Sequence, residues 1–272
     1  MNPTHGALPL PVAYGSADVI DAVRIAPDWP GLALAASQIG VTLDAEALTR
    51  FAQYRDLLFQ RNAEYNLTAI RDAEGIERKL FLDALAMFPA LDRALDRAPR
   101  PIEGSQRLVD VGAGAGFPGI PLKIARPDLE VTLIDATAKK VRFLNEVIAN
   151  LQLNDTRAFH GRAEEVGQEP AFREHYDIAT ARAVASLPVL LEYVVPILKV
   201  GGTALLPKGL EIDEELRLGH LSAAALGAEI VSAERLPVAG TRLVVAVKVN
   251  RTPAAYPRRT GIPSRSPLGE GT

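Results

Sequence analysis

Three glycines at alternate positions follow directly on a short apolar run. Residues 108–111 are apolar apart from Asp110, and they lead into Gly112, Gly114 and Gly116. Glycine is needed where a backbone turns tightly and a ligand lies directly against it. A plain turn between a strand and a helix does not need three glycines. The segment therefore predicts a ligand-binding loop at the end of a strand.

The spacing of these glycines distinguishes between the ligands that such loops bind. A dinucleotide-binding loop has its third glycine three residues after the second, and here that position is Phe117. The Gly-Lys-Ser/Thr of a P-loop does not follow either. The next apolar run ends in Asp135, whose carboxylate can accept both hydroxyls of an adenosine ribose or can face a helix N-terminus. Together these features favour S-adenosylmethionine (SAM) over NAD.

The elements that would position the loop alternate along the chain. Strands are expected at residues 107–111, 131–135, 176–179 and 202–206, and an amphipathic helix at 138–151. Such alternation implies parallel strands joined by right-handed helical crossovers. Residues 229–236 and 242–249 predict an antiparallel hairpin at the end of the sheet. The expected fold class is α/β, a Rossmann-like SAM methyltransferase sheet that is mostly parallel.

A small helical segment precedes this sheet. Helices are expected over residues 43–62 and 73–95, and the prolines and glycine of residues 97–104 break the second. The chain then divides into four parts. They are a partly ordered extension (1–40), an N-terminal helical region (41–100), a SAM-dependent methyltransferase domain (101–250) and a basic, proline-rich C-terminal tail (251–272).

Composition narrows the chemistry further. The 272 residues include no cysteine and four histidines, which excludes thiolate chemistry, and we expect no metal. The N-terminus has no secretory signal pattern and no apolar stretch is long enough to span a membrane, so we expect a cytoplasmic protein. The formal net charge is −3, so a nucleic acid must be held by local basic patches. We expect a monomer.

Seven short segments are similar to those of a known family. They are Asn-Leu-Thr-Ala-Ile at 66–70, Val-Asp-Val-Gly-Ala-Gly-Ala-Gly-Phe-Pro-Gly-Ile-Pro-Leu at 109–122, Lys-Val-Arg-Phe-Leu at 140–144, Gly-Arg-Ala-Glu-Glu at 161–165, Ala-Arg-Ala-Val-Ala-Ser-Leu at 181–187, Lys-Gly at 208–209 and Tyr-Pro-Arg-Arg-Thr-Gly-Ile-Pro at 256–263. In these segments the chain resembles the bacterial small-subunit ribosomal RNA guanine-N7 methyltransferases, known as RsmG or GidB. The resemblance runs from about residue 43 to residue 268.

The resemblance implies transfer of a methyl group from SAM to N7 of a specific guanine in 16S ribosomal RNA. The cofactor-site residues that it implies are Gly112, Phe117, Ala163, Glu164 and Arg182. The glycine spacing and the acidic end of the next apolar run add Gly114, Gly116 and Asp135. One motif departs from the family's usual His-x-Leu-Asp-Ser-Leu, because the matching run at 80–85 keeps Asp83 but has Leu80 and Ala84.

The chemistry of guanine N7 needs little from the protein. N7 carries an in-plane lone pair, so it can attack the methyl group in a direct in-line displacement without losing a proton first. Catalysis then comes mainly from proximity and orientation, and no catalytic residue is assigned. Arg182 is a candidate for positioning either the SAM carboxylate or the guanine edge. We favour SAM, because an arginine that bound both O6 and N7 of guanine would cover the atom to be methylated. The target guanine is expected to be unpaired.

Local basic clusters are the expected RNA contacts. The candidates are Lys139, Lys140, Arg142, Lys208, Arg258, Arg259 and Arg265. The expected partner is small-subunit ribosomal RNA or a small-subunit assembly particle. Removal of residues 251–272 is expected to weaken RNA binding and leave SAM affinity unchanged. Two alternatives stay open, namely a SAM-dependent methyltransferase of another substrate and a non-catalytic SAM-binding module in ribosome assembly.

Overall fold

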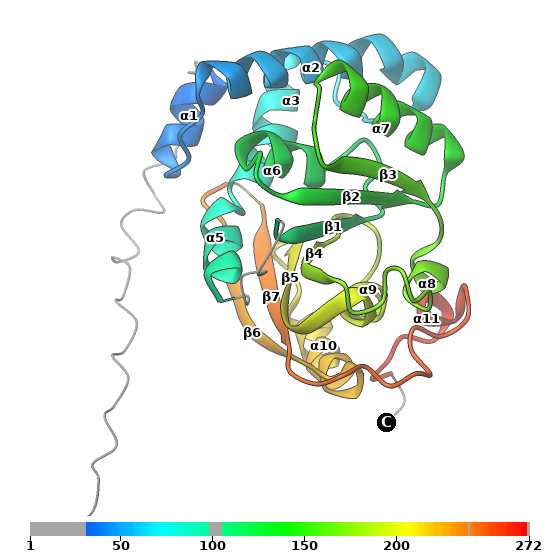
Figure 1. Cartoon of the computed structure of the whole chain (residues 1–272). Helices are drawn as coiled ribbons and strands as arrows, with labels where there is room; N and C mark the ends of the chain where they lie inside the picture. Colours follow the sequence, from blue (N-terminus) through cyan, green and yellow to red (C-terminus); the bar gives the residue numbers. More distant parts are fainter. Residues whose placement is uncertain (1–30, 98–104, 239, 271–272) are drawn as a thin grey trace, which may run out of the picture.

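A sheet of seven strands lies at the centre of the part of the chain that the computed structural model describes, residues 31–97, 105–238 and 240–270 (Figure 1). The strands are β1 (Arg107–Val111), β2 (Glu130–Asp135), β3 (Thr156–His160), β4 (Tyr176–Thr180), β5 (Leu198–Lys208), β6 (Ala228–Arg235) and β7 (Arg242–Lys248). The helices are α1 (Leu32–Gln38), α2 (Ala45–Tyr65), α3 (Ala73–Ile76), η2 (Glu77–Leu82), α4 (Asp83–Leu85), α5 (Phe88–Arg97), α6 (Gly119–Ala125), α7 (Ala138–Asn150), α8 (Ala163–Val166), α9 (Leu187–Val194), η3 (Val195–Ile197), α10 (Asp213–Leu226) and α11 (Ile262–Arg265).

The strand order is β3-β2-β1-β4-β5-β7-β6. The strands from β3 to β5 are parallel, whereas β7 lies antiparallel between β5 and β6. The predicted sheet, mostly parallel with an antiparallel hairpin at its end, is therefore confirmed. The chain moves outward from β1 to β3 on one side and returns to β4 on the other. A ligand crevice is expected where the order reverses, at the carboxyl ends of β1 and β4.

Alternate residues of the central strands face two separate apolar cores. Leu108 and Leu133 belong to the core beneath α5, α6 and α7, whereas Val109 and Ile134 belong to the core beneath α9 and α10. This alternation follows from the two-residue period of a strand. Figure 1 shows α6 and α7 on one side of the sheet and α9 and α10 on the other.

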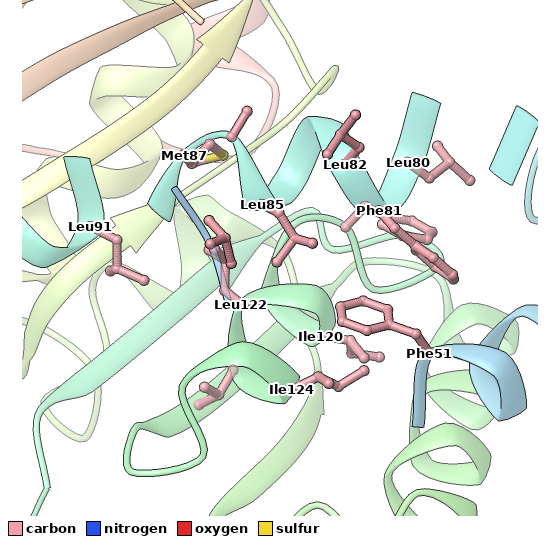
Figure 2. Packing of buried hydrophobic residues seen from close by; sticks show 14 of the residues in the cluster. Phe51, Leu80, Phe81, Leu82, Leu85, Met87, Leu91, Ile120, Leu122 and Ile124 are labelled. Atoms are coloured by element: carbon pink, nitrogen blue, oxygen red, sulfur yellow. The ribbon is translucent and has the colours of Figure 1, made fainter. Parts of the chain in front are cut away.

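Helix α2 and the segment from α3 to α4 form a further layer outside α6. The side chain of Asp44 caps the N-terminus of α2 by accepting a backbone N–H. Figure 2 shows Phe81 and Leu85 on the side of this segment that faces Ile120 and Leu122 of α6. The helical N-terminal segment is thus packed on the same core as the sheet, directly behind the glycine loop.

The helix predicted over residues 73–95 is present but interrupted at residues 86–87. The structure divides this stretch into α3, the six-residue π-helical η2, α4 and a separate α5. Pro89 is the second residue of α5, where the missing N–H of proline is tolerated. The helix restarts at this point, and the apolar spacing continues through the break, so the pattern alone does not reveal it.

Strand β3 was not expected, because it is an edge strand whose side chains are only partly buried and carry no apolar run. Residues 1–30 of the predicted extension lie outside the described residues, and Leu32 of the following α1 packs into the first core. None of the described helices is long and apolar enough to cross a membrane.

Candidate cofactor and substrate site

The glycine loop between β1 and α6 has a backbone that other residues rarely adopt. Gly112, Gly114 and Gly116 have φ values of +72°, +60° and +99°. A Cβ atom on Gly112 would lie 2.6 Å from a methyl group of Val184, so the loop needs glycine here for close packing. A Cβ atom on Gly114 would meet only the loop's own backbone, at 3.9 Å. The space beside Gly114 is open, as a ligand-binding backbone requires.

Gly116 was predicted to bind the cofactor, but in the structure it packs against the core. A Cβ atom there would lie 2.4 Å from Ile120 Cδ1 and 2.7 Å from the Tyr54 hydroxyl oxygen, so Gly116 faces the core beneath the loop. Tyr54 of α2 donates a hydrogen bond to the Ala115 carbonyl oxygen, and its ring stacks on Phe117 at 5.4 Å. Helix α2 therefore holds the loop from behind. Tyr54 lies on the apolar stripe of its helix, so the sequence marks it only as a core residue.

Asp110 supports the same loop from within the sheet. It is fully buried, and its Oδ2 accepts a hydrogen bond of 2.9 Å from the N–H of Gly119, the first residue of α6. No described residue donates to its Oδ1. Burial raises the pKa of Asp110 to about 7; the Gly119 N–H lowers it, Asp135 raises it and Arg182 lowers it. Asp110 is thus a carboxyl group that titrates near neutral pH.

Asp135 at the end of β2 connects the loop to the next helix. It is 5% exposed, and its Oδ2 accepts the N–H of Gly114 at 2.9 Å. Its Oδ1 accepts the N–H of Thr137, the residue before α7, at 2.8 Å. Each carboxylate oxygen can accept a second hydrogen bond. Asp135 therefore fixes the helix start and still has acceptor capacity for two ribose hydroxyls.

Two adjoining cavities open along the carboxyl ends of these strands. The smaller, about 180 Å³, is lined by Gly112, Asp135, Ala163 and Glu164 among others. The larger, about 450 Å³, is lined by Gly112, Gly114, Phe117, Asp135 and Arg182 among others. Of the predicted cofactor residues, only Gly116 lines neither of these two cavities. The structure thus brings residues from four separate motifs into one elongated site of the size that binds small molecules.

The segment at residues 66–70, one of the segments similar to the family, forms one wall of the larger cavity. The buried side chain of Asn62 accepts the N–H groups of Leu67 and Thr68 at 2.8 and 3.0 Å, and it donates to the Thr68 carbonyl at 2.9 Å. Leu67 and Thr68 line the cavity as a result. Leu80, which stands at the family's usual histidine position, also lines it, whereas Ala84 is buried.

The C-terminal tail closes the smaller cavity. Glu164 is 6% exposed, and its Oε1 accepts the N–H of Gly261 at 2.9 Å and the Tyr193 hydroxyl at 3.4 Å. Gly261, Ser264 and Tyr193 line the cavity together with Ala163. Tail residues thus form a wall of the predicted adenine side, so the structure favours an effect of the tail on SAM binding over the expected independence.

Several bonds hold the tail on the body of the protein. Arg258 makes a bidentate pair with the fully buried Glu192, at 2.6 to 3.2 Å, and this pair raises the pKa of Arg258 above its ordinary value. Arg173 donates to the carbonyl oxygens of Thr252 and Tyr256 at 2.8 and 2.7 Å. The guanidinium of Arg258 is thus engaged inside the protein, and we drop it from the candidates for RNA contact.

The other predicted RNA contacts divide by exposure. Lys208 is mostly buried, 2.7 Å from Glu215 and 2.9 Å from the Ala185 carbonyl oxygen, so it too is engaged internally. Lys140 lines the larger cavity, with its ammonium 4.0 Å from Asp135. Four of the predicted side chains remain at the surface of α7 or of the tail. Lys139 lies over the ring of Tyr65, and Arg142, Arg259 and Arg265 are exposed.

Arg182 lies between two structural partners. Its Nη1 is 3.0 Å from Asp83 Oδ2, and its Nη2 donates to the Lys79 carbonyl oxygen at 3.0 Å. Ala183, the next residue, has a φ of +54°, a conformation that is costly for a residue with a side chain. The segment after β4 is therefore held in a strained conformation at the edge of the larger cavity.

These features define a class before they define a family. A parallel sheet with an antiparallel β7, a glycine loop after β1 and a carboxylate at the end of β2 form the SAM-dependent methyltransferase fold. The family model described as rRNA small subunit methyltransferase G (GidB) matches residues 47–240, and the chain belongs to this family.

Known relatives cover most of the chain. It is 42% identical over 249 residues to a ribosomal RNA small subunit methyltransferase G of Roseiflexus castenholzii, covering 90% of this chain and 98% of the relative. It is 44% identical over 237 residues to the protein of that name from Acetivibrio thermocellus, covering 86% and 93%. Among solved structures, it is similar to a SAM-dependent methyltransferase from Aquifex aeolicus, with a TM-score of 0.47 and 18% identity over 65% of this chain and 94% of the other.

Proposed function

We propose that this protein transfers a methyl group from SAM to N7 of a specific guanine in small-subunit (16S) ribosomal RNA. The observation that carries the proposal is the elongated site at the switch point of the sheet, in a chain that belongs to the rRNA small subunit methyltransferase G family. The residues of the site fit SAM. The open space at Gly114 admits a ligand against the backbone, and acidic and apolar groups are spread along the two cavities.

SAM supplies an electrophilic methyl group on a positively charged sulfur. Asp135 would accept the two ribose hydroxyls, since each of its oxygens has one acceptor position left. Ala163 and Glu164 would face the adenine in the smaller cavity. The methionine end would then extend along Gly112 and Gly114 into the larger cavity, whose rim includes Arg182.

The residues of the site suit a reaction that needs no general base. No histidine is among the residues lining the two cavities in the described part of the chain. An unprotonated N7 needs no general base, because its lone pair is already free to attack the methyl carbon. The protein's contribution is to hold the base and the methyl group in line and to exclude water, which is catalysis by proximity.

Half-buried and exposed cations on α7 and the tail are the proposed contacts to RNA phosphate. We retain Lys139, Lys140 and Arg142 at the start of α7 and Arg259 and Arg265 on the tail. Both groups border the cavities through Lys140 and through Gly261 and Ser264. We also propose action as a cytoplasmic monomer without metal, and the four-part division of the chain given above.

The proposal is tested by incubating the purified protein and methyl-labelled SAM with naked small-subunit ribosomal RNA, with intact small subunits and with an RNA-free extract. Label in RNA of either of the first two samples is expected. Label in the RNA-free extract alone would point to another substrate. Binding of SAM with no transfer to any of the three would favour a non-catalytic assembly module.

A further inference from the structure

A third cavity adjoins the cofactor site on the side away from the adenine. Its volume is about 210 Å³, and it lies at the carboxyl ends of β4 and β5, where Arg182 and Lys208 line it. It shares Arg182 and Ala183 with the larger cavity. A base held in this third cavity would therefore lie beside the part of the larger cavity that receives the methionine end of SAM.

A nearly buried carboxylate lines this cavity. The side chain of Asp83 is 11% exposed, and its Oδ1 accepts a hydrogen bond of 2.8 Å from Thr241 Oγ1. Its Oδ2 lies 3.0 Å from Arg182 Nη1. Asp83 is the first residue of α4, and its two partners come from the segment after β4 and the residue before β7, so the cluster joins three parts of the fold. Each oxygen retains one acceptor position.

Two features of this cluster point to a ligand. Arg182 Nη1 is buried, and it makes no aligned hydrogen bond to any described residue despite its short distance from Asp83. A buried donor without an acceptor is costly unless something supplies one. The strained Ala183 lies on the wall of the same cavity.

Resting on the function proposed above, we propose that this cavity receives the target guanine and that Asp83 and Arg182 read its Watson–Crick edge. That edge presents an acceptor, O6, followed by two donors, N1–H and the 2-amino group. Arg182 Nη1 offers the matching donor, and the two oxygens of Asp83 offer the matching acceptors. Adenine has a donor in place of O6, an acceptor at N1 and no 2-amino group, so it would leave these buried groups unpaired.

The carboxylate also suits the charge that develops during transfer. N7 forms the bond to the methyl carbon as the carbon–sulfur bond breaks and sulfur keeps the electron pair, so no proton leaves and the base becomes a cation. This charge spreads over the ring and makes N1–H and the 2-amino group stronger donors. A fixed carboxylate hydrogen-bonded to them interacts more strongly with the transition state than with the bound base. Binding the Watson–Crick edge leaves N7 uncovered.

The first test changes the substrate and leaves the protein intact. Once the methylated guanine is mapped, small-subunit ribosomal RNA is assembled with inosine at that position, which removes only the 2-amino group. We expect kcat/KM to fall roughly 10- to 100-fold, the scale of one hydrogen bond to a charged group. An equal kcat/KM on inosine and guanine would overturn the inference. If the wild-type protein methylates neither RNA, the proposed function itself fails.

The second test changes Asp83, the residue proposed to bind the Watson–Crick edge. Asp83→Asn keeps the size of the side chain but places an amide donor against the base, so kcat should fall at least 10-fold while SAM affinity stays within about twofold. The inosine penalty should also disappear in this variant. A full inosine penalty in Asp83→Asn would overturn the inference, as would unchanged kcat. Asp92→Asn serves as the matched control, because it alters a half-exposed aspartate of α5 that pairs with Arg126.

Discussion

Burial of Asp110 predicts how the stability of the protein changes with pH. Its pKa is about 7 in the folded protein and 3.8 without the protein environment. The folded state therefore holds a proton that the unfolded state has lost between these two pH values, so stability falls as pH rises from about 4 through 7. A difference of about 3 pKa units corresponds to a loss of about 4 kcal/mol in the free energy of unfolding, since each unit is worth about 1.4 kcal/mol.

The perturbation is Asp110→Asn. Asparagine keeps an oxygen to accept the Gly119 N–H, and it cannot ionise. The groups that face Asp110 are Tyr54, Asp135, Arg182 and the Gly119 N–H, and all remain in the variant. The variant should therefore be similar to the wild type near pH 4 and should gain on it by about 4 kcal/mol by pH 9.

The assay is urea unfolding of both proteins at pH 5, 6, 7, 8 and 9, with Asp92→Asn as the control for loss of a half-exposed carboxylate. The difference between Asp110→Asn and wild type should grow from pH 5 to 7 and level off by pH 8, and that of the control should stay flat. A difference that is constant over this range, or that shrinks as pH rises, would refute the reasoning about Asp110.

Three further predictions concern the cofactor site. Asp135→Ala should weaken SAM binding by about 1–3 kcal/mol in calorimetry, and an unchanged affinity would exclude the ribose role. Gly114→Ala places a methyl group in the open space and should abolish SAM binding. Gly40→Ala, at a similar φ of +80°, is the control, and it should lower the stability of the protein and leave SAM affinity unchanged. Equal SAM affinity in the two variants would exclude a role for Gly114 in SAM binding. Removal of residues 251–272 should lower SAM affinity as well as RNA binding, because the tail lines the smaller cavity; an unchanged SAM affinity would restore the purely RNA-binding role.

The central strands and the cofactor loop were predictable because both leave local signals. Buried parallel strands appear as short apolar runs, and β1, β2 and β4 lie within one residue of the predicted bounds. The glycines mark positive φ, and Asp135 marks the end of a strand beside them. Since carboxyl ends of parallel strands meet at one edge, these residues had to converge.

The polar contacts behind the site were not predictable. Tyr54, Asp110 and Asp83 each lie in an apolar pattern, which shows which face is buried but not which partner lies across it. The basic tail was misleading for a related reason. The charge of Arg258 does not show that Glu192, 66 residues earlier, is buried beneath it.

The position of the methyl group on the RNA decides whether this protein is a guanine-N7 methyltransferase of ribosomal RNA. Small-subunit ribosomal RNA or subunits lacking the modification are incubated with the protein and SAM, digested to nucleosides and analysed by mass spectrometry, with the site mapped by sequencing of the intact RNA. We expect one 7-methylguanosine per RNA, at an unpaired guanine. A methyl group at another atom of guanine, on another base or on a ribose, or no methylation of RNA at all, would contradict this expectation.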